Sequence, residues 1–292
     1  MKRHLRNAII TLLCLVAMMS GFIAVQVNFD KRYLSSEKSI RELVYFPSAR
    51  AVKLISAGNE LMMADYLWLR MIQYYGFHQQ SDRNFEYLYP ITDNLTDLDP
   101  KFLYPYTFGS LLLIHDAQDS VNSLKLLDKA KRANPDKWQF PYMKGFILYV
   151  FLHRSDEAVK EFVEASKLPK AWEGALRFAA WISRKEGQRE TSKRMWQELY
   201  DKSANKNERG IAKFYLDQIY IEEEVDRYQS LAIKYHKNTG KWPENLDDLK
   251  AAGFVSDIPK DLFGGKYYWN REQNQVRNTT QDAFLRRIGK LK

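Results

Sequence analysis

Apolar and polar positions divide the chain into three regions of different pattern. Residues 8–27 form an uninterrupted stretch without a charged side chain. Residues 48–76 and 207–240 carry apolar positions at helical spacing, and each predicts one long helix, the second ending at Gly240 as a helix C-cap. After Gly240 turn residues become frequent, and the aromatic run 267–269 predicts a short strand, with another around Val276. The pattern predicts a mostly helical chain with a small mixed module at its C-terminus.

Within the helical region a short motif occurs twice at a fixed distance. The motif P-Y-x-x-G spans Pro105–Gly109 and returns at 141–145, an offset of 36 residues. An amphipathic segment follows each copy and ends at a proline, which cannot continue a helix. With one earlier segment these terminal prolines are Pro100, Pro135 and Pro169, which lie 35 and 34 residues apart. Such a period indicates stacked helical hairpins.

This spacing resembles the tetratricopeptide repeat (TPR), a helix-turn-helix unit of about 34 residues. The resemblance implies that Gly109 and Gly145 let helix B of each unit approach helix A closely. In helix B it implies packing through Ser123, Leu127 and Ala130, and then through Ala158, Phe162 and Ala165. For a third, more degenerate unit it implies Ala179 in helix A and Thr191, Met195 and Glu198 in helix B. The resemblance covers roughly residues 50–200, and an irregular helical bundle is the alternative.

The TPR resemblance also implies a concave binding groove lined by helix A of each unit. Its groove-facing positions fall on Tyr106, Ser110 and Leu113, and in the next unit on Tyr142, Phe146 and Tyr149. Aromatic side chains offer large apolar area at a small entropic cost, which suits an extended peptide. We therefore expect protein partners to bind in this groove through Tyr106, Ser110, Tyr142, Phe146 and Tyr149. The alternative is that several of these side chains pack between helices.

Two motifs stand in the C-terminal region. The first consists of Gly240, Trp242 and Pro243, and the second of Pro259, Asp261, Phe263 and Gly264. Over about forty residues they resemble the C-terminal part of type IV pilins and type II secretion pseudopilins, although Leu262 replaces a usual proline and the N-terminus lacks a prepilin cleavage site. We expect a small folded appendage that does not polymerise. Asp257 and Asp261 could supply oxygens to calcium, or could simply be turn aspartates.

The apolar stretch 8–27 has the length of a membrane-spanning helix. It predicts an uncleaved anchor, with a cleaved signal peptide and a lipoprotein as alternatives. Lys2, Arg3 and Arg6 precede the stretch, which favours a cytoplasmic N-terminus. The expected localisation is the bacterial inner membrane, crossed once, with the C-terminal body in the periplasm. The single cysteine, Cys14, lies within the stretch and excludes a disulfide framework.

The formal net charge of +9 does not indicate a nucleic-acid partner, because most of it lies at the chain ends. Residues 1–6 carry +3 and residues 270–292 carry +4, so the intervening body carries only +2. A nucleic-acid-binding domain concentrates its basic residues on its folded face. We expect the basic ends to serve topology and contact with anionic lipid or an acidic partner.

The sequence contains no motif that indicates catalysis. Its histidines at 78, 115, 153 and 236 are dispersed, and no metal-binding pair, nucleophile elbow or phosphate-binding loop occurs. We expect no catalytic residue, no metal, no cofactor and no small-molecule substrate.

The predicted fold is an all-α, TPR-like helical-hairpin solenoid with an N-terminal transmembrane helix and a small α+β C-terminal appendage. The expected domains are an anchor at 1–28, TPR-like repeats at 29–206, a long capping helix at 207–239 and a pilin-like module with a basic tail at 240–292. The expected function is a membrane-anchored periplasmic scaffold or assembly factor in envelope, secretion, pilus or surface-filament biogenesis. The alternatives are an exported enzyme or its accessory subunit, and a permanent structural subunit of a membrane complex.

Overall fold

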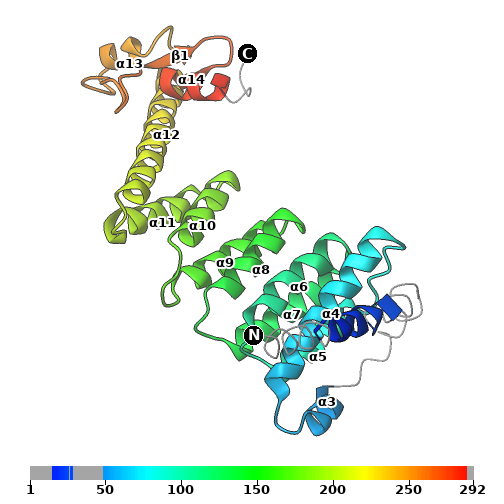
Figure 1. Cartoon of the computed structure of the whole chain (residues 1–292). Coiled ribbons are helices and arrows are strands. Elements are labelled where there is room, and N and C mark those ends of the chain that lie inside the picture. The colour runs from blue at the N-terminus through cyan, green and yellow to red at the C-terminus, as the bar shows by residue number, and fades with distance from the viewer. Residues whose placement is uncertain (1–14, 26, 29–48, 288–292) are drawn as a thin grey trace, which may run out of the picture. The chain divides into compact units, whose positions relative to one another are not determined.

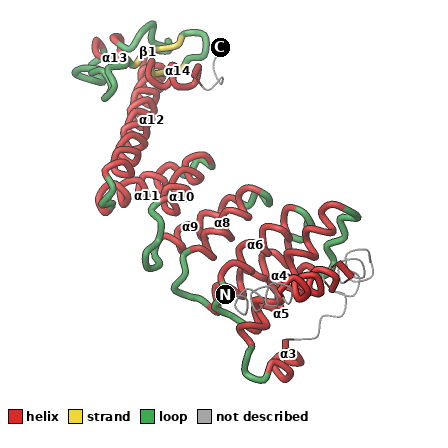
Figure 2. Tube along the Cα trace, viewed as in Figure 1, coloured by secondary structure: helices red, strands yellow, loops and turns green. Residues whose placement is uncertain are grey.

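Helices make up most of the described chain, and two short strands lie near its C-terminal end (Figures 1 and 2). The computed structural model describes residues 15–25, 27–28 and 49–287. Contacts between Cα atoms divide the chain into two compact units, Met1–Pro135 and Asp136–Lys292.

The predicted single-pass localisation in the inner membrane, with a periplasmic body, is contradicted. Of the predicted span 8–27, residues 8–14 and 26 lie outside the described residues. Within the described part of the chain, residues 15–25 are helical, and no helix there is both long and apolar enough to cross a bilayer. The membrane localisation is therefore withdrawn.

The first unit begins with two helices where the sequence predicted one. Helix α3 (Ala49–Ser56) and helix α4 (Glu60–Gln80) are separated by Ala57 and Gly58, whose φ angles are 48° and 91°. A positive φ cannot be accommodated within a right-handed helix, so the chain changes direction here. Helix on both sides of the break was predicted correctly, but the break itself was not.

Two helical hairpins complete the first unit. Helix α4 packs against α5 (Leu88–Leu98), and α6 (Leu103–His115) packs against α7 (Ser120–Ala133). Gly109 of α6 lies where a Cβ atom would stand 2.7 Å from Thr92 Cγ2 and 3.2 Å from Leu126 Cδ2. Only a glycine permits this approach on both sides, which confirms the close-packing role predicted for Gly109.

The second unit continues the hairpin arrangement. Its helices are α8 (Gln139–Val150), α9 (Ser155–Ser166), α10 (Gly174–Lys185), α11 (Arg189–Lys202) and α12 (Lys206–Thr239). Each helix in this series packs against the next, and α12 packs against α11 through its first half. A Cβ atom at Gly145 would lie 3.2 Å from the Ala158 carbonyl oxygen and from the Phe162 ring. The predicted packing of Gly145 against Ala158 and Phe162 is confirmed.

The third predicted TPR-like repeat, formed by α10 and α11, packs one residue away from the predicted register. The side chains buried in helix B are Ser192, Trp196 and Leu199, not Thr191, Met195 and Glu198. One residue corresponds to about 100° of helix rotation, so the prediction selected a neighbouring face. With the observed register the unit keeps the small–large pattern of its neighbours and is less degenerate than its sequence indicates.

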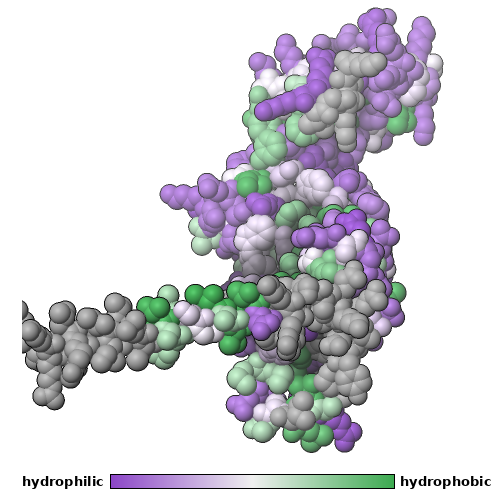
Figure 3. All heavy atoms as spheres, turned by 45° about the vertical axis from the view of Figure 1, so that its right-hand side comes forward, coloured by the Kyte–Doolittle hydropathy of each residue, from purple (hydrophilic) through white to green (hydrophobic). Residues whose placement is uncertain are grey.

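The C-terminal module packs on the second half of α12. It contains α13 (Asp247–Ala251), β1 (Tyr267–Asn270), β2 (Gln275–Asn278) and α14 (Thr279–Arg287). The strands pair antiparallel with Trp269 opposite Val276, so both predicted strands are present. The buried core shared by α12 and the module consists of Ile221, Tyr228, Ala232, Leu246, Leu249, Tyr267, Trp269 and Val276. Gly240 ends α12 with a φ of 73°, as expected for a C-cap. The surface of the module is mostly hydrophilic (Figure 3).

The turn around Asp261 is organised by hydrogen bonds. Asp261 Oδ1 accepts from the backbone N–H groups of Phe263 and Gly265, both at 2.8 Å, and Oδ2 accepts from Asn278 Nδ2 at 2.8 Å. Asp257 is exposed and pairs with Lys250 at 3.4 Å. The two carboxylates thus face different partners, and the geometry favours turn aspartates over the calcium alternative.

Candidate partner-binding surface

The two predicted binding residues of helix α6 are buried. Tyr106 and Ser110 both have 0% exposure. The Tyr106 hydroxyl donates to the carbonyl of Thr96 or Pro100, each at 3.4 Å, and burial raises the pKa of Tyr106 to about 12. The Ser110 carbonyl accepts a bond of 2.8 Å from Ser123 Oγ. Both residues therefore pack between helices, as the alternative to groove binding predicted.

A one-residue register difference explains this burial. The P-Y-x-x-G motif aligns Gly109 with Gly145, but the packing aligns Ser110 with it. The carbonyl of Ser110 accepts from Ser123 Oγ at 2.8 Å, and that of Ala180 accepts from Ser192 Oγ at 2.7 Å. Gly145 is the residue that faces Ala158 at the corresponding place. The repeat period of helix A is therefore 35 residues here, one fewer than the motif indicates.

The three predicted residues of the second unit lie at the surface of α8. Tyr142, Phe146 and Tyr149 are each half-buried. Tyr142 packs edge-on against Phe178, with ring centroids 6.3 Å apart, and burial raises the pKa of Tyr142. Tyr149 packs edge-on against Trp181, with centroids 6.0 Å apart. The predicted residues of α8 therefore continue into an aromatic surface on α10.

We call this surface the aromatic face, which consists of Tyr142, Phe146, Tyr149, Phe178 and Trp181. Trp181 remains 37% exposed, so its indole is available to a partner. Lys185 Nζ donates to the Tyr149 hydroxyl at 2.9 Å and lies 5.6 Å from the centroid of Trp181. The face thus joins apolar rings to a cation at its edge.

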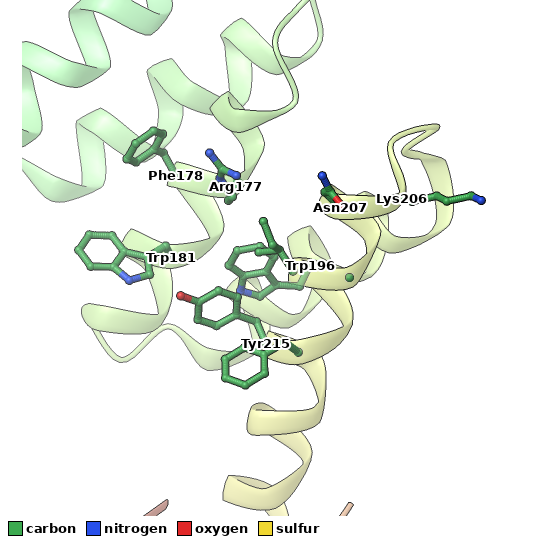
Figure 4. Close-up of a pocket in the computed structure, with 10 residues that line it drawn as sticks. Arg177, Phe178, Trp181, Trp196, Lys206, Asn207 and Tyr215 are labelled. Carbon is green, nitrogen blue, oxygen red and sulfur yellow. The ribbon is translucent and has the colours of Figure 1, made fainter. Parts of the chain in front are cut away.

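A cavity of about 870 Å³ adjoins the aromatic face between α10, α11 and α12 (Figure 4). Phe178 and Trp181 belong to both the face and the cavity wall. The other lining residues are Arg177, Trp196, Lys206, Asn207, Gly210, Ile211, Phe214 and Tyr215. The lining is mainly aromatic and aliphatic, and Phe214 is 41% exposed. A cavity of this kind can accept large apolar side chains.

Stacked rings form one wall of the cavity. Trp196 of α11 is fully buried and lies parallel to Tyr215 of α12, with centroids 4.3 Å apart. Figure 4 shows Trp181 and Tyr215 approaching from different helices, with Trp196 beside Tyr215. The Trp196 Nε1–H group is buried and has no hydrogen-bond partner among the described residues. The stack joins α11 to α12 at this wall.

The charged residues near the cavity are engaged in pairs or point away from it. Arg177 donates to Glu208 Oε1 at 2.8 Å, which ties α10 to the start of α12. Arg184 pairs with Glu222 and lies 5.8 Å from the ring centroid of Tyr215. Lys206 points away from the cavity in Figure 4. The site therefore offers an apolar surface with fixed charges at its border.

Phe178, Trp181, Phe214 and Tyr215 were not predicted from the sequence. With Ala180 aligned to Gly145, the positions equivalent to Tyr142, Phe146 and Tyr149 become Arg177, Trp181 and Arg184. Two of these line the cavity. For Phe178 and Trp181 the available signal was the period of small and apolar residues in α10, where Leu176, Ala179, Ala180 and Ser183 form the buried stripe.

No protein-family model matches the chain, and a comparison with curated proteins finds no match. Among solved structures the chain is similar to a thermophilic TPR protein of Thermus thermophilus, at 15% identity and a TM-score of 0.33, over 56% of this chain and 98% of that one. It is also similar to yeast Tom70, at 16% identity and a TM-score of 0.28, over 64% of this chain and 45% of Tom70. A third similar structure is pilF of Pseudomonas aeruginosa, at 15% identity and a TM-score of 0.36, over 65% and 89% of the two chains. Because these scores are low, the helical-repeat assignment rests on the hairpins described above.

Proposed function

We propose that this chain is a protein-interaction scaffold whose second unit binds an extended segment of a partner protein. The segment lies on the aromatic face and places one large apolar side chain in the adjoining cavity. The observation that carries this proposal is that Tyr149 contacts Trp181, which also lines the cavity. The ring centroids of Tyr149 and Trp181 are 6.0 Å apart.

Aromatic surfaces of this kind are suited to binding. Tyrosine and tryptophan contribute a large contact area and have few rotatable bonds, so they lose little entropy when a partner binds. The face is also built on helices that are packed on their other side, which limits the cost of organising it. Binding residues on rigid helices discriminate partners by shape and by the spacing of apolar side chains.

Catalysis is not proposed. Of the charged residues that line the cavity, Arg177 is held by Glu208, and Lys206 points away. An enzyme would instead need ionisable groups that converge on a space large enough for a substrate. The pilin-like motifs after Gly240 add a further prediction, that the partner belongs to a secretion or surface-filament assembly.

Site-specific photo-crosslinking tests the proposal. A photoreactive phenylalanine analogue at position 181, and another at the exposed position 104 of the first unit, are compared in cells. We expect position 181 to crosslink one discrete protein and position 104 to give no such product. Crosslinks to nucleic acid, or the same products from both positions, would overturn the proposal.

A second candidate, a permanent subunit of a complex, is favoured by the apolar surface of α4. Leu61, Met62 and Leu69 are 64%, 65% and 60% exposed on this helix. Exposed apolar clusters of this kind mark interfaces. Size-exclusion chromatography with light scattering distinguishes the candidates, because a scaffold with a transient partner runs as one species of its own mass. A permanent subunit instead aggregates when it is isolated and runs as a defined complex when purified under mild conditions.

A further inference from the structure

The two-stranded sheet of the C-terminal module has two edges that differ in how they are covered. In an antiparallel pair, opposed residues alternate between those that bond to each other and those whose N–H and C=O groups point outward. The Lys266 carbonyl accepts from Thr279 N–H at 3.0 Å, which marks this pair as a bonded one. The register then makes Tyr268–Arg277 a bonded pair as well. The backbone groups of the residues between these pairs point outward.

Helix α12 pairs with backbone groups along the outer edge of β2. Val276 N–H donates to Gln229 Oε1 at 2.7 Å, and Gln229 Nε2 donates to the carbonyl of Asn274, just before β2, at 3.3 Å. Gln229 therefore binds two backbone groups along this edge from the helix on which the sheet packs. Its bond to Val276 also confirms the alternation, since that N–H group points away from Trp269.

The outward groups of β1 have no such cover. Tyr267 and Trp269 stand opposite Asn278 and Val276, so their backbone N–H and C=O groups point away from β2. None of these four groups is hydrogen-bonded to another described residue. The Tyr267 and Trp269 side chains are buried in the core, which holds the strand in place. The edge is thus a fixed row of unpaired donors and acceptors.

A groove of about 400 Å³ runs beside this edge. Its walls are α13 and residues 258–260, and Tyr267, Tyr268 and Trp269 lie along it. Pro259 lies in the opposite wall and has no backbone N–H group. It therefore cannot donate a hydrogen bond to the edge of β1. The groove leaves room for a short extended segment beside β1.

The groove is basic. Lys250, Lys260 and Lys266 line it, and Asp247 is the acidic residue among its lining. Asp247 already pairs with Lys250 at 3.0 Å. Lys260 and Lys266 form no ion pair with another described residue. Two cations therefore remain beside the unpaired strand edge, and they complement an acidic segment.

We propose that the edge of β1 binds an extended acidic segment of a partner protein by strand addition. The segment pairs with the outward backbone groups of Tyr267 and Trp269, and its carboxylates face Lys260 and Lys266. Main-chain hydrogen bonds supply affinity in this mode, and the charges select the partner. The site is separate from the aromatic face, so it does not depend on the function proposed above.

The test uses the full chain and a capped heptapeptide of alternating glutamate and valine. We expect the peptide to bind and the amides of Tyr267 and Trp269 to become protected from hydrogen exchange. The double variant Lys260→Glu/Lys266→Glu should weaken binding about tenfold. The matched control Lys234→Glu/Lys237→Glu changes the net charge equally on the exposed surface of α12 and should leave binding unchanged.

Two N-methylated peptides separate strand addition from simple charge attraction. Methyl groups on the alternate amides that face β1 should abolish binding, and methyl groups on the other amides should not. Equal binding of both peptides, or binding without protection of Tyr267 and Trp269, would overturn the proposal. Protection that rises with protein concentration in the absence of peptide would also overturn it and would identify a second copy as the occupant.

Discussion

Trp196 of α11 stacks on Tyr215 of α12, with ring centroids 4.3 Å apart and ring planes inclined by 10°. This contact joins the last hairpin to the long helix and forms a wall of the cavity. Trp196 is fully buried, so its removal leaves a space that the packed helices cannot fill.

Trp196→Ala should lower the free energy of unfolding by about 3–5 kcal/mol, because it creates a cavity and removes the stack. Urea denaturation followed by circular dichroism measures the change. Trp196→Phe is the control, since Nε1 has no partner to lose among the described residues. A loss for phenylalanine as large as that for alanine would contradict the assigned role of packing.

Gly109→Ala should destabilise the protein by about 1–3 kcal/mol, because the new methyl group would overlap the buried side chain of Thr92. Gly76→Ala is the matched control within α4. No atom lies within 4 Å of the Cβ position at Gly76, so alanine should stabilise the helix by about 0.5–1 kcal/mol. The midpoint temperatures of thermal unfolding of the two variants should therefore shift in opposite directions. Equal shifts would show that close packing at Gly109 is not the determinant.

Trp181→Ala and Tyr106→Ala should affect different properties. Trp181 is 37% exposed on the aromatic face, so its removal should weaken partner binding at least tenfold and cost less stability than the removal of a fully buried ring. Tyr106 is buried, so its removal should cost about 3–5 kcal/mol of stability. Crosslinking yield and denaturation curves, measured on both variants, check the separation. Tyr200→Ala, which removes an exposed ring of α11 outside the face, should change neither property.

The C-terminal module should lose stability in acid through Asp261. Burial alone would raise the pKa of this carboxyl group, but hydrogen bonds from Thr280, Asn278, Gly265 and Phe263 outweigh burial and lower it. A lowered pKa stabilises the fold above the unfolded value of about 3.9, and this contribution disappears as pH falls through the folded value. The protection factors of the β1 amides, which are exchange rates corrected for the intrinsic rate at each pH, should fall between pH 6 and pH 3. In Asp261→Asn this fall should be smaller, and an unchanged profile would contradict the assignment.

Local features of the fold could be read from the sequence because they depend on neighbouring residues. The C-cap at Gly240, the strands around Trp269 and Val276, and the close approach at Gly109 and Gly145 each require a particular residue type at one position. The break at Ala57 and Gly58 was missed although Gly58 is a residue that readily takes a positive φ. The predicted membrane localisation is contradicted because no helix among the described residues is both long and apolar enough to cross a bilayer.

By itself the sequence determined the hairpin order and the small residues at which helices approach, and it gave the repeat period to within one residue. Only the tertiary structure decided which face of each helix is buried, because one residue of register turns a helix by about 100°. That rotation buried Tyr106 and Ser110, and it brought Trp181 to the surface beside Tyr149. The open edge of β1 was likewise decided by packing, since Gln229 of α12 binds the edge of β2, whereas no described residue bonds to the outward groups of β1.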